Sequence, residues 1–237
     1  MSITVDQRST QAHNASSTSF GTNPSSGDKI VLAIWAFFSG GGPPTISSVT
    51  DNGTSPATWV VDVSITDALN NGVVWIYRAD NVSLPSAGSL AITVNWTHMT
   101  LNEMGATALL GAASGAPQST NSAEVSGVTS ASLSAGTGAG AGSFYLGVHN
   151  DNGGTPETQT ISGVFTTRFS QGTAGNIAGQ AADFIGSGSQ TFSPGWTGGS
   201  ANSRDVIAVY SAAAVATAPR RRLLALNAVR RASYNPR

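Results

Sequence analysis

The chain has 237 residues, a length typical of one large β domain or two small ones. It contains no cysteine, which excludes disulfides, thiolate-bound zinc and thiol catalysis. Only 10% of its residues are charged and the net charge is −1, against about 25% charged residues in an average soluble domain, so we expect a polar but weakly charged surface.

The first part of the chain predicts a short strand, a loop and a strand buried on both faces. Residues 2–8 (SITVDQR) favour a strand, and the polar, turn-rich residues 9–28 favour a loop. Residues 29–38 (KIVLAIWAFF) are apolar on both parities, which indicates a central strand covered on both sides. A buried helix is the alternative for this run.

Residues 46–96 predict a β-meander, because apolar and polar residues alternate at a period of two between short turns. The turn signals are DNG at 51–53 and NNG at 70–72, since Asn and Gly tolerate positive φ. Trp59, Trp75 and Trp96 fall among the alternating residues and are expected in the core. The predicted strands lie near 46–50, 58–65, 72–78 and 89–96.

The remainder of the body continues this pattern more weakly. Small residues within 104–113 indicate that another part of the chain approaches closely, and the glycine-rich residues 136–142 indicate a connector. The predicted strands lie near 104–113, 125–133, 144–148, 159–169, 176–185, 190–193 and 205–213.

Ten to twelve short strands, with no amphipathic helix before residue 218, predict an all-β fold. We expect an antiparallel two-sheet β-sandwich of the jelly-roll-like type over residues 1–216, because a strand at 29–38 needs cover on both faces. Residues 217–237 are expected to form a separate, extended or short helical C-terminal arm.

Several segments together resemble a β-sandwich that recurs in virion structural proteins of tailed bacteriophages and in some bacterial surface proteins. The resemblance covers about residues 25–214 and includes no catalytic motif. It implies a non-enzymatic virion part, either a minor tail subunit or a decoration protein of the head, whose partners are tail or capsid subunits and further copies of itself. The matching segments are GDKIVLAI (27–34), ISSVTDNG (46–53), VVWIYRADNV (73–82), SLAITVNW (89–96), GSFYL (142–146) and RDVIAVYSAA (204–213).

The C-terminal arm is strongly basic. Residues 220–237 hold six arginines and no acid, whereas the rest of the chain holds five basic and 12 acidic residues, a charge of 5 − 12 = −7. Such a split indicates an interaction tail. A helix starting near Pro219 would place arginines unfavourably at its N-terminus, so a strand added to a neighbour's sheet and a disordered tail stay open. The predicted partner-binding residues are Arg220, Arg221, Arg222, Leu223, Leu224, Leu226, Arg230 and Arg231; the leucines make nucleic acid the less favoured partner.

No motif for an enzyme or a cofactor is present: the chain lacks a P-loop, HExxH and GxSxG. His149 and Asp151 are the best candidate for a metal pair, but a histidine beside a turn is usually solvated, so no metal is predicted. Asp62 and Glu103 lie within strand-like runs and are the carboxylates that a glycosidase would need to bring together. We therefore predict that the chain is not an enzyme.

Trp196 lies in SPGWTGGS, which indicates a loop, and is the best exposed aromatic candidate for stacking on a sugar. It supports an alternative function as a host-adhesion module that binds a cell-surface glycan. The N-terminus lacks the pattern of a signal peptide and no run of 18 apolar residues occurs, so we expect synthesis in the host cytoplasm and no membrane contact.

Overall fold

The computed structural model describes residues 2–40, 42–67, 72–151, 158–172, 178–197 and 201–214. Every regular element in these ranges is a β-strand, and the sheets are antiparallel. The predicted all-β class is therefore confirmed. Within the described ranges no helix is long and apolar enough to cross a membrane.

The N-terminal half of the body, residues 2–110, forms a large and a small sheet that pack face to face. The large sheet has the order β1 (Thr4–Arg8), β9 (Leu101–Leu110), β4 (Lys29–Phe37), β7 (Gly72–Ala79) and β6 (Trp59–Asp67), with β2 (Ala12–His13) also paired to β9. The small sheet has the order β3 (Ser17–Ser19), β8 (Ala91–His98) and β5 (Thr45–Asp51).

The C-terminal half, residues 119–210, again forms a large and a small sheet. The large sheet has the order β10 (Ser119–Val128), β17 (Ala201–Tyr210), β12 (Ser143–Asp151), β15 (Ala178–Gly186) and β14 (Thr166–Gly172). The small sheet has the order β11 (Leu133–Ala135), β16 (Gln190–Trp196) and β13 (Gln159–Ser162).

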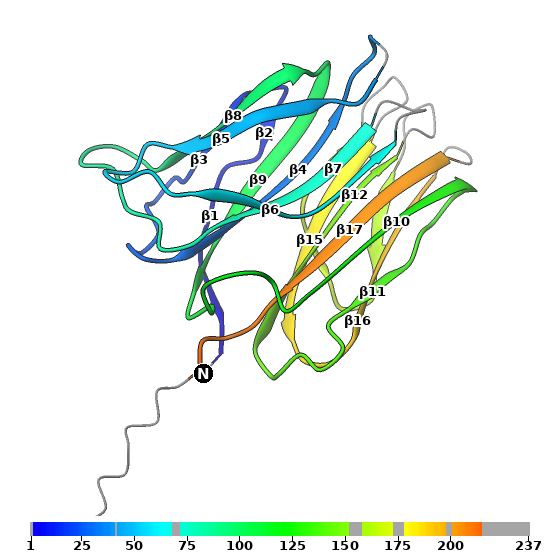
Figure 1. Ribbon diagram of the computed structural model, residues 1–237. Helices are drawn as coiled ribbons and strands as arrows, with labels where there is room; N and C mark the ends of the chain where they lie inside the picture. The colour runs from blue at the N-terminus through cyan, green and yellow to red at the C-terminus, as the bar shows by residue number, and fades with distance from the viewer. Residues whose placement is uncertain are drawn as a thin grey trace, which may run out of the picture.

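The two large sheets pack against each other, so the molecule has four β layers rather than the two that we predicted (Figure 1). Strand β4 confirms the predicted two-sided burial: Leu32 and Ile34 face the small sheet of their own half, and Val31 and Trp35 face the other half. The prediction of two sheets failed because β12 is also buried on both faces, although it carries polar residues such as His149.

The two halves repeat one strand order. If the two-residue β2 is left out, each half has eight strands, and numbering them along the chain gives the order 1-8-3-6-5 in both large sheets and 2-7-4 in both small sheets. A face-to-face arrangement of two such units places the same strands of each half on the shared interface.

A β-bulge occurs at the same place in both halves and carries a charge-reversed ion pair. The pairing of β6 with β7 skips Asp62, and the pairing of β14 with β15 skips Arg168. Asp62 bonds Arg78 on β7, whereas Arg168 bonds Asp183 on β15. Arg78 and Asp183 lie opposite the residue two positions before the respective bulge, so the two pairs are topologically equivalent.

Three boundary predictions are wrong. Residues 9–28 contain strands β2 and β3 and not only a loop, because polar Thr18 is buried and pairs with β8. The run predicted at 125–133 is the end of β10 and the start of β11, and the run at 159–169 is divided between β13 and β14 at Gly163, whose φ of 92° interrupts the strand.

The predicted close approach at 104–113 is confirmed: a Cβ on Gly105 would lie 2.9 Å from the ring of Phe169.

Candidate functional site

Trp196 does not lie in an exposed loop, so that prediction is wrong. It ends strand β16, only 5% of it is exposed, and its ring stacks on the His149 imidazole with the centroids 4.9 Å apart and the planes 23° apart. The strand continues through Pro194 because β13 pairs with this part of β16. The large apolar residues that are more than a third exposed in the described chain are aliphatic (Val60, Val61, Leu110, Val164 and Ile185), so none of them is an aromatic ring for a sugar.

His149 is buried and lies between two carboxylates, so the expectation of a solvated histidine is also wrong. Its Nδ1 lies 2.8 Å from Asp205 Oδ1 and its Nε2 lies 2.8 Å from Asp151 Oδ2, and all three side chains are 0% exposed. Burial alone would lower the pKa of His149, but the charges and hydrogen bonds of Asp205 and Asp151 outweigh it and raise the pKa to about 9. The imidazole is therefore a buried cation at neutral pH.

His149, Asp151 and Asp205 form a group that we call the His149 triad, and both of its carboxylates have further polar partners. The Ser203 hydroxyl donates to Asp205 at 2.5 Å, and the Gln159 amide donates to Asp151 at 2.6 Å. Because both ring nitrogens bond carboxylates, neither is available to bind a metal or to accept a proton from a substrate. Among the described residues no group of three or more His, Asp or Glu side chains is arranged to hold a metal ion. The triad joins β12 to β17 and acts structurally.

The two candidate glycosidase carboxylates have separate partners. Asp62 bonds Arg78 and accepts a 2.6 Å hydrogen bond from the Tyr210 hydroxyl. Glu103 accepts from Gln11 and from His13, the latter at 3.1 Å, and burial raises its pKa. The fold uses each carboxylate to satisfy neighbouring donors and does not present them as a pair.

The central interface, meaning the contact between the two large sheets, contains all five basic residues of the described chain. Each is bonded to a polar partner there or lies against the other half. Arg8 bonds Asp183 at 2.8 Å, Lys29 bonds Asp80 at 2.9 Å, Arg78 bonds Asp62, Arg168 bonds Asp183 at 2.6 Å, and Arg204 bonds Asn150 at 2.9 Å beneath Gly72 of the other half. The Arg8–Asp183 ion pair joins the two halves, whereas the other four cations bond partners within their own half.

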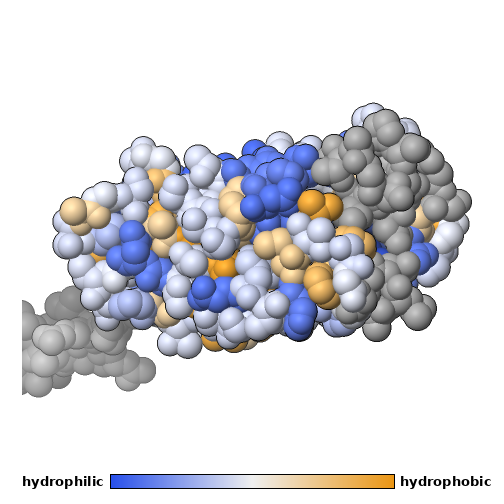
Figure 2. All heavy atoms as spheres, turned by 90° about the horizontal axis from the view of Figure 1, so that it is seen from above, coloured by the Kyte–Doolittle hydropathy of each residue, from blue (hydrophilic) through white to orange (hydrophobic). Residues whose placement is uncertain are grey.

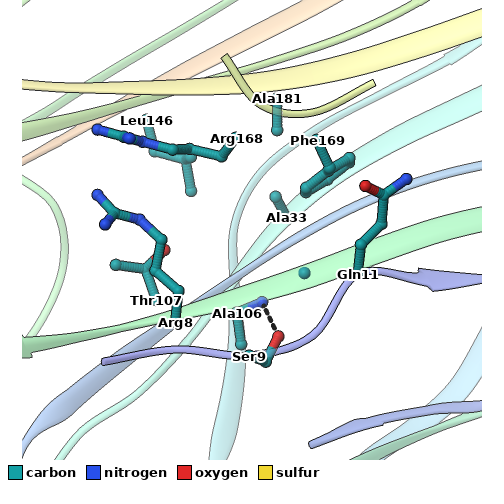
Figure 3. A pocket seen from close by; sticks show the side chains of 11 residues that line it. Arg8, Ser9, Gln11, Ala33, Ala106, Thr107, Leu146, Arg168, Phe169 and Ala181 are labelled. Carbon is teal, nitrogen blue, oxygen red and sulfur yellow. Dashed lines mark hydrogen bonds between the residues drawn. The ribbon is translucent and has the colours of Figure 1, made fainter. Parts of the chain in front are cut away.

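A pocket of about 40 Å³ opens at one side of this interface, between β1, β9 and β14 (Figure 3). Arg8 and Arg168 lie side by side at one end of it, and Phe169 and Gln11 lie at the other. Small apolar residues, including Ala33 and Ala181, line the space between them. The sequence carries no local signal for this pocket, because its lining comes from segments up to 173 residues apart, from Arg8 to Ala181.

One face of the described chain mixes residues of different hydropathy (Figure 2). On the face shown in Figure 2, most described residues have intermediate hydropathy, and the hydrophilic and hydrophobic groups are small and separate. The eight predicted partner-binding residues of the C-terminal arm, from Arg220 to Arg231, lie outside the described residues.

Comparison with known proteins gives no relative for this chain. No family model matches it, and neither the search of curated proteins nor that of solved structures finds a match.

Proposed function

We propose that the chain is a non-enzymatic structural subunit of a tailed-bacteriophage virion, a minor tail or tail-associated protein held on the particle by its arginine-rich C-terminal arm. One observation carries this proposal. The five basic residues of the body are committed to the central interface, whereas residues 220–237 add six arginines and no acid. The arm therefore carries more than half of the chain's cations, and none of its arginines has an acid within the same segment.

We also propose that each half is a variant of the jelly roll, in which the fifth strand joins the larger sheet. Eight antiparallel strands in two packed sheets are the basis of this assignment. Jelly rolls occur in viral capsid proteins and in lectins, which supports a role in a particle. The fold alone is shared by many functions, so the arm and not the sandwich provides the main support.

The arm's chemistry fits an acidic protein surface with an apolar groove. Guanidinium groups form paired hydrogen bonds with carboxylates, and Leu223, Leu224 and Leu226 would gain by burial in the groove. Strand β17 runs from the end of the body that holds the His149 triad to the opposite end, where the described chain stops at Ala214 beside the N-terminal strand (Figure 1). Attachment through the arm would thus leave the triad end pointing away from the partner.

A truncation before Ala218 tests this function. Full-length chain should co-sediment with virions purified from lysed producer cells, and the truncated chain should remain in the soluble fraction with an unchanged melting temperature. A matched variant with glutamine at positions 220, 221, 222, 230 and 231 keeps the leucines and should also be lost from the particle. Incorporation of both variants at the full-length level would contradict attachment through the arm, and absence of the full-length chain from purified virions would contradict the virion role.

The position within the virion has two alternatives, the tail and the decorated surface of the head. Gold labelling of a tag placed at the N-terminus would distinguish them by electron microscopy. Tail labelling is the expected result, and labels distributed over the head would favour a decoration protein.

A further inference from the structure

The two sides of the central interface are equivalent in topology but are filled differently. On the β6 side, the bulge pair Asp62–Arg78 is covered by Tyr210 of the other half, whose hydroxyl donates to Asp62. The Lys29 ammonium lies 5.2 Å from the centre of the Tyr210 ring and bonds Asp80. This side therefore has two cations, two acids and an aromatic ring that fills the space between the sheets.

On the β14 side, one acid serves two cations. Arg168 bonds Oδ1 of Asp183 at 2.6 Å, and Arg8 of the other half bonds Oδ2 at 2.8 Å. Glu103, whose partner Gln11 lines the pocket, already accepts from Gln11 and His13. The group of Arg8, Arg168 and Asp183 therefore has a net charge of +1, whereas the two cations and two acids of the β6 side have a net charge of zero.

On this side the aromatic ring, Phe169, lies at the far end of the pocket from the two arginines, and the pocket occupies the space between them (Figure 3). Its volume of about 40 Å³ is enough for roughly three water molecules at 10–15 Å³ each. Small side chains at Ala33, Gly105 and Ala181 leave this space open, and Phe169 provides an apolar wall.

The two arginines retain hydrogen-bonding capacity at one end of the pocket (Figure 3). Each uses Nε and Nη2 on Asp183, and within the described chain neither Nη1 has a bonded partner. The side chains are 35% and 33% exposed, so a solute can reach them. Two planar guanidinium groups beside a small apolar hollow suit a carboxylate on a short carbon chain. The carboxylate oxygens would accept hydrogen bonds from the guanidinium N–H groups, and the carbon atoms would pack against Phe169.

We propose that this pocket is a binding site for a carboxylate group of about acetate to propionate size, with Arg8 and Arg168 as its cationic contacts. The carboxylate would supply the missing negative charge, and its methyl or methylene group would occupy the hollow. The source is either a free small acid or an acidic side chain of a protein partner. The site lies in the body, so it stands independently of the role proposed for the C-terminal arm.

Nuclear magnetic resonance of the full-length chain tests this site directly. Sodium propionate is titrated at constant ionic strength, and the Nε–H resonances of the arginines are followed. We expect saturable shifts of Arg8 and Arg168 with a Kd of about 1 mM, and no shift of Arg78, the arginine of the equivalent closed side. Equal, non-saturable shifts of all three would show only general ion pairing and would overturn the site.

Two variants test the space in the pocket and its positive charge separately. Ala181→Leu fills the hollow and leaves both arginines in place, and Arg168→Gln removes one cation while Asp183 keeps Arg8. Each should weaken propionate binding at least tenfold; if Ala181→Leu does not fold, Thr107→Leu fills the same pocket from β9. Unchanged affinity in the filled variant would refute the site.

Tighter binding of inorganic phosphate than of propionate would refute the carboxylate assignment. Comparison of propionate with N-acetylglutamate amide distinguishes a free small acid from an acidic side chain as the source.

Discussion

The His149 triad predicts a specific dependence of stability on pH. The histidine has a pKa of about 9 in the folded chain, against about 6.5 in the unfolded chain. Between these values the folded state binds more protons than the unfolded state, so the free energy of unfolding falls as pH rises. The full contribution is present below pH 6.5 and is lost as pH passes about 9. A difference of 2.5 in pKa corresponds to about 3 kcal/mol.

Urea unfolding at pH 6, 7.5 and 9.5, followed by tryptophan fluorescence, measures this dependence. The double variant His13→Gln, His98→Gln removes the two histidines outside the triad and should keep the loss of about 3 kcal/mol. His149→Gln leaves Asp151 and Asp205 buried without their cation, which should cost about 3–5 kcal/mol at pH 6. A free energy of unfolding for the wild type that is level from pH 6 to 9.5 would refute the buried imidazolium. So would a His149→Gln variant as stable as the wild type.

Two further predictions concern packing at the central interface. Tyr210→Phe removes the hydrogen bond to Asp62 at a residue that is 1% exposed and should lower the free energy of unfolding by about 1.5–3 kcal/mol; a loss below about 0.5 kcal/mol in urea unfolding would count against a bond of this strength. Gly179→Ala places a Cβ 2.2 Å from Trp35 Nε1 and should cost about 1–3 kcal/mol or more through overpacking. Gly21→Ala, whose Cβ meets nothing within 4 Å, is the matched control, and equal melting temperatures of the two variants would contradict the clash.

The strands that could be predicted were those whose side chains follow a simple pattern. Residues 29–38 are apolar on both parities and form the doubly covered β4, and the alternating residues 58–65 form most of β6. Strand β12 is equally buried, but it includes Gly147 and His149, whose places depend on Phe192 and Asp205 from other strands and on Asp151 at the end of β12 itself. Alternation with a period of two predicts a strand with one solvent-exposed face and one buried face. It does not predict a strand in which polar residues are buried together with hydrogen-bonding partners.

The sites were harder to predict than the fold because their residues come together from different strands and, for the pocket, from the two halves. Trp196 follows Pro and Gly, which are typical of loops, yet it lies against His149 in a buried network. Arg8 and Arg168 are single basic residues in polar surroundings, and only the pairing of both with Asp183 makes them neighbours. Their meeting depends on the packing of one large sheet on the other, which no local pattern encodes.

Composition and periodicity alone determined that this chain is an antiparallel β protein without disulfides, with a weakly charged body and a basic end. These properties follow from local preferences, since turn residues and alternation act over a few positions. Tertiary structure decided that there are four layers, that the halves repeat one strand order, and that Arg8 of one half forms an ion pair with Asp183 of the other. Those features depend on which sheet faces pack against each other and on which charged side chains become neighbours in that packing. Both are set by contacts between residues far apart in the chain.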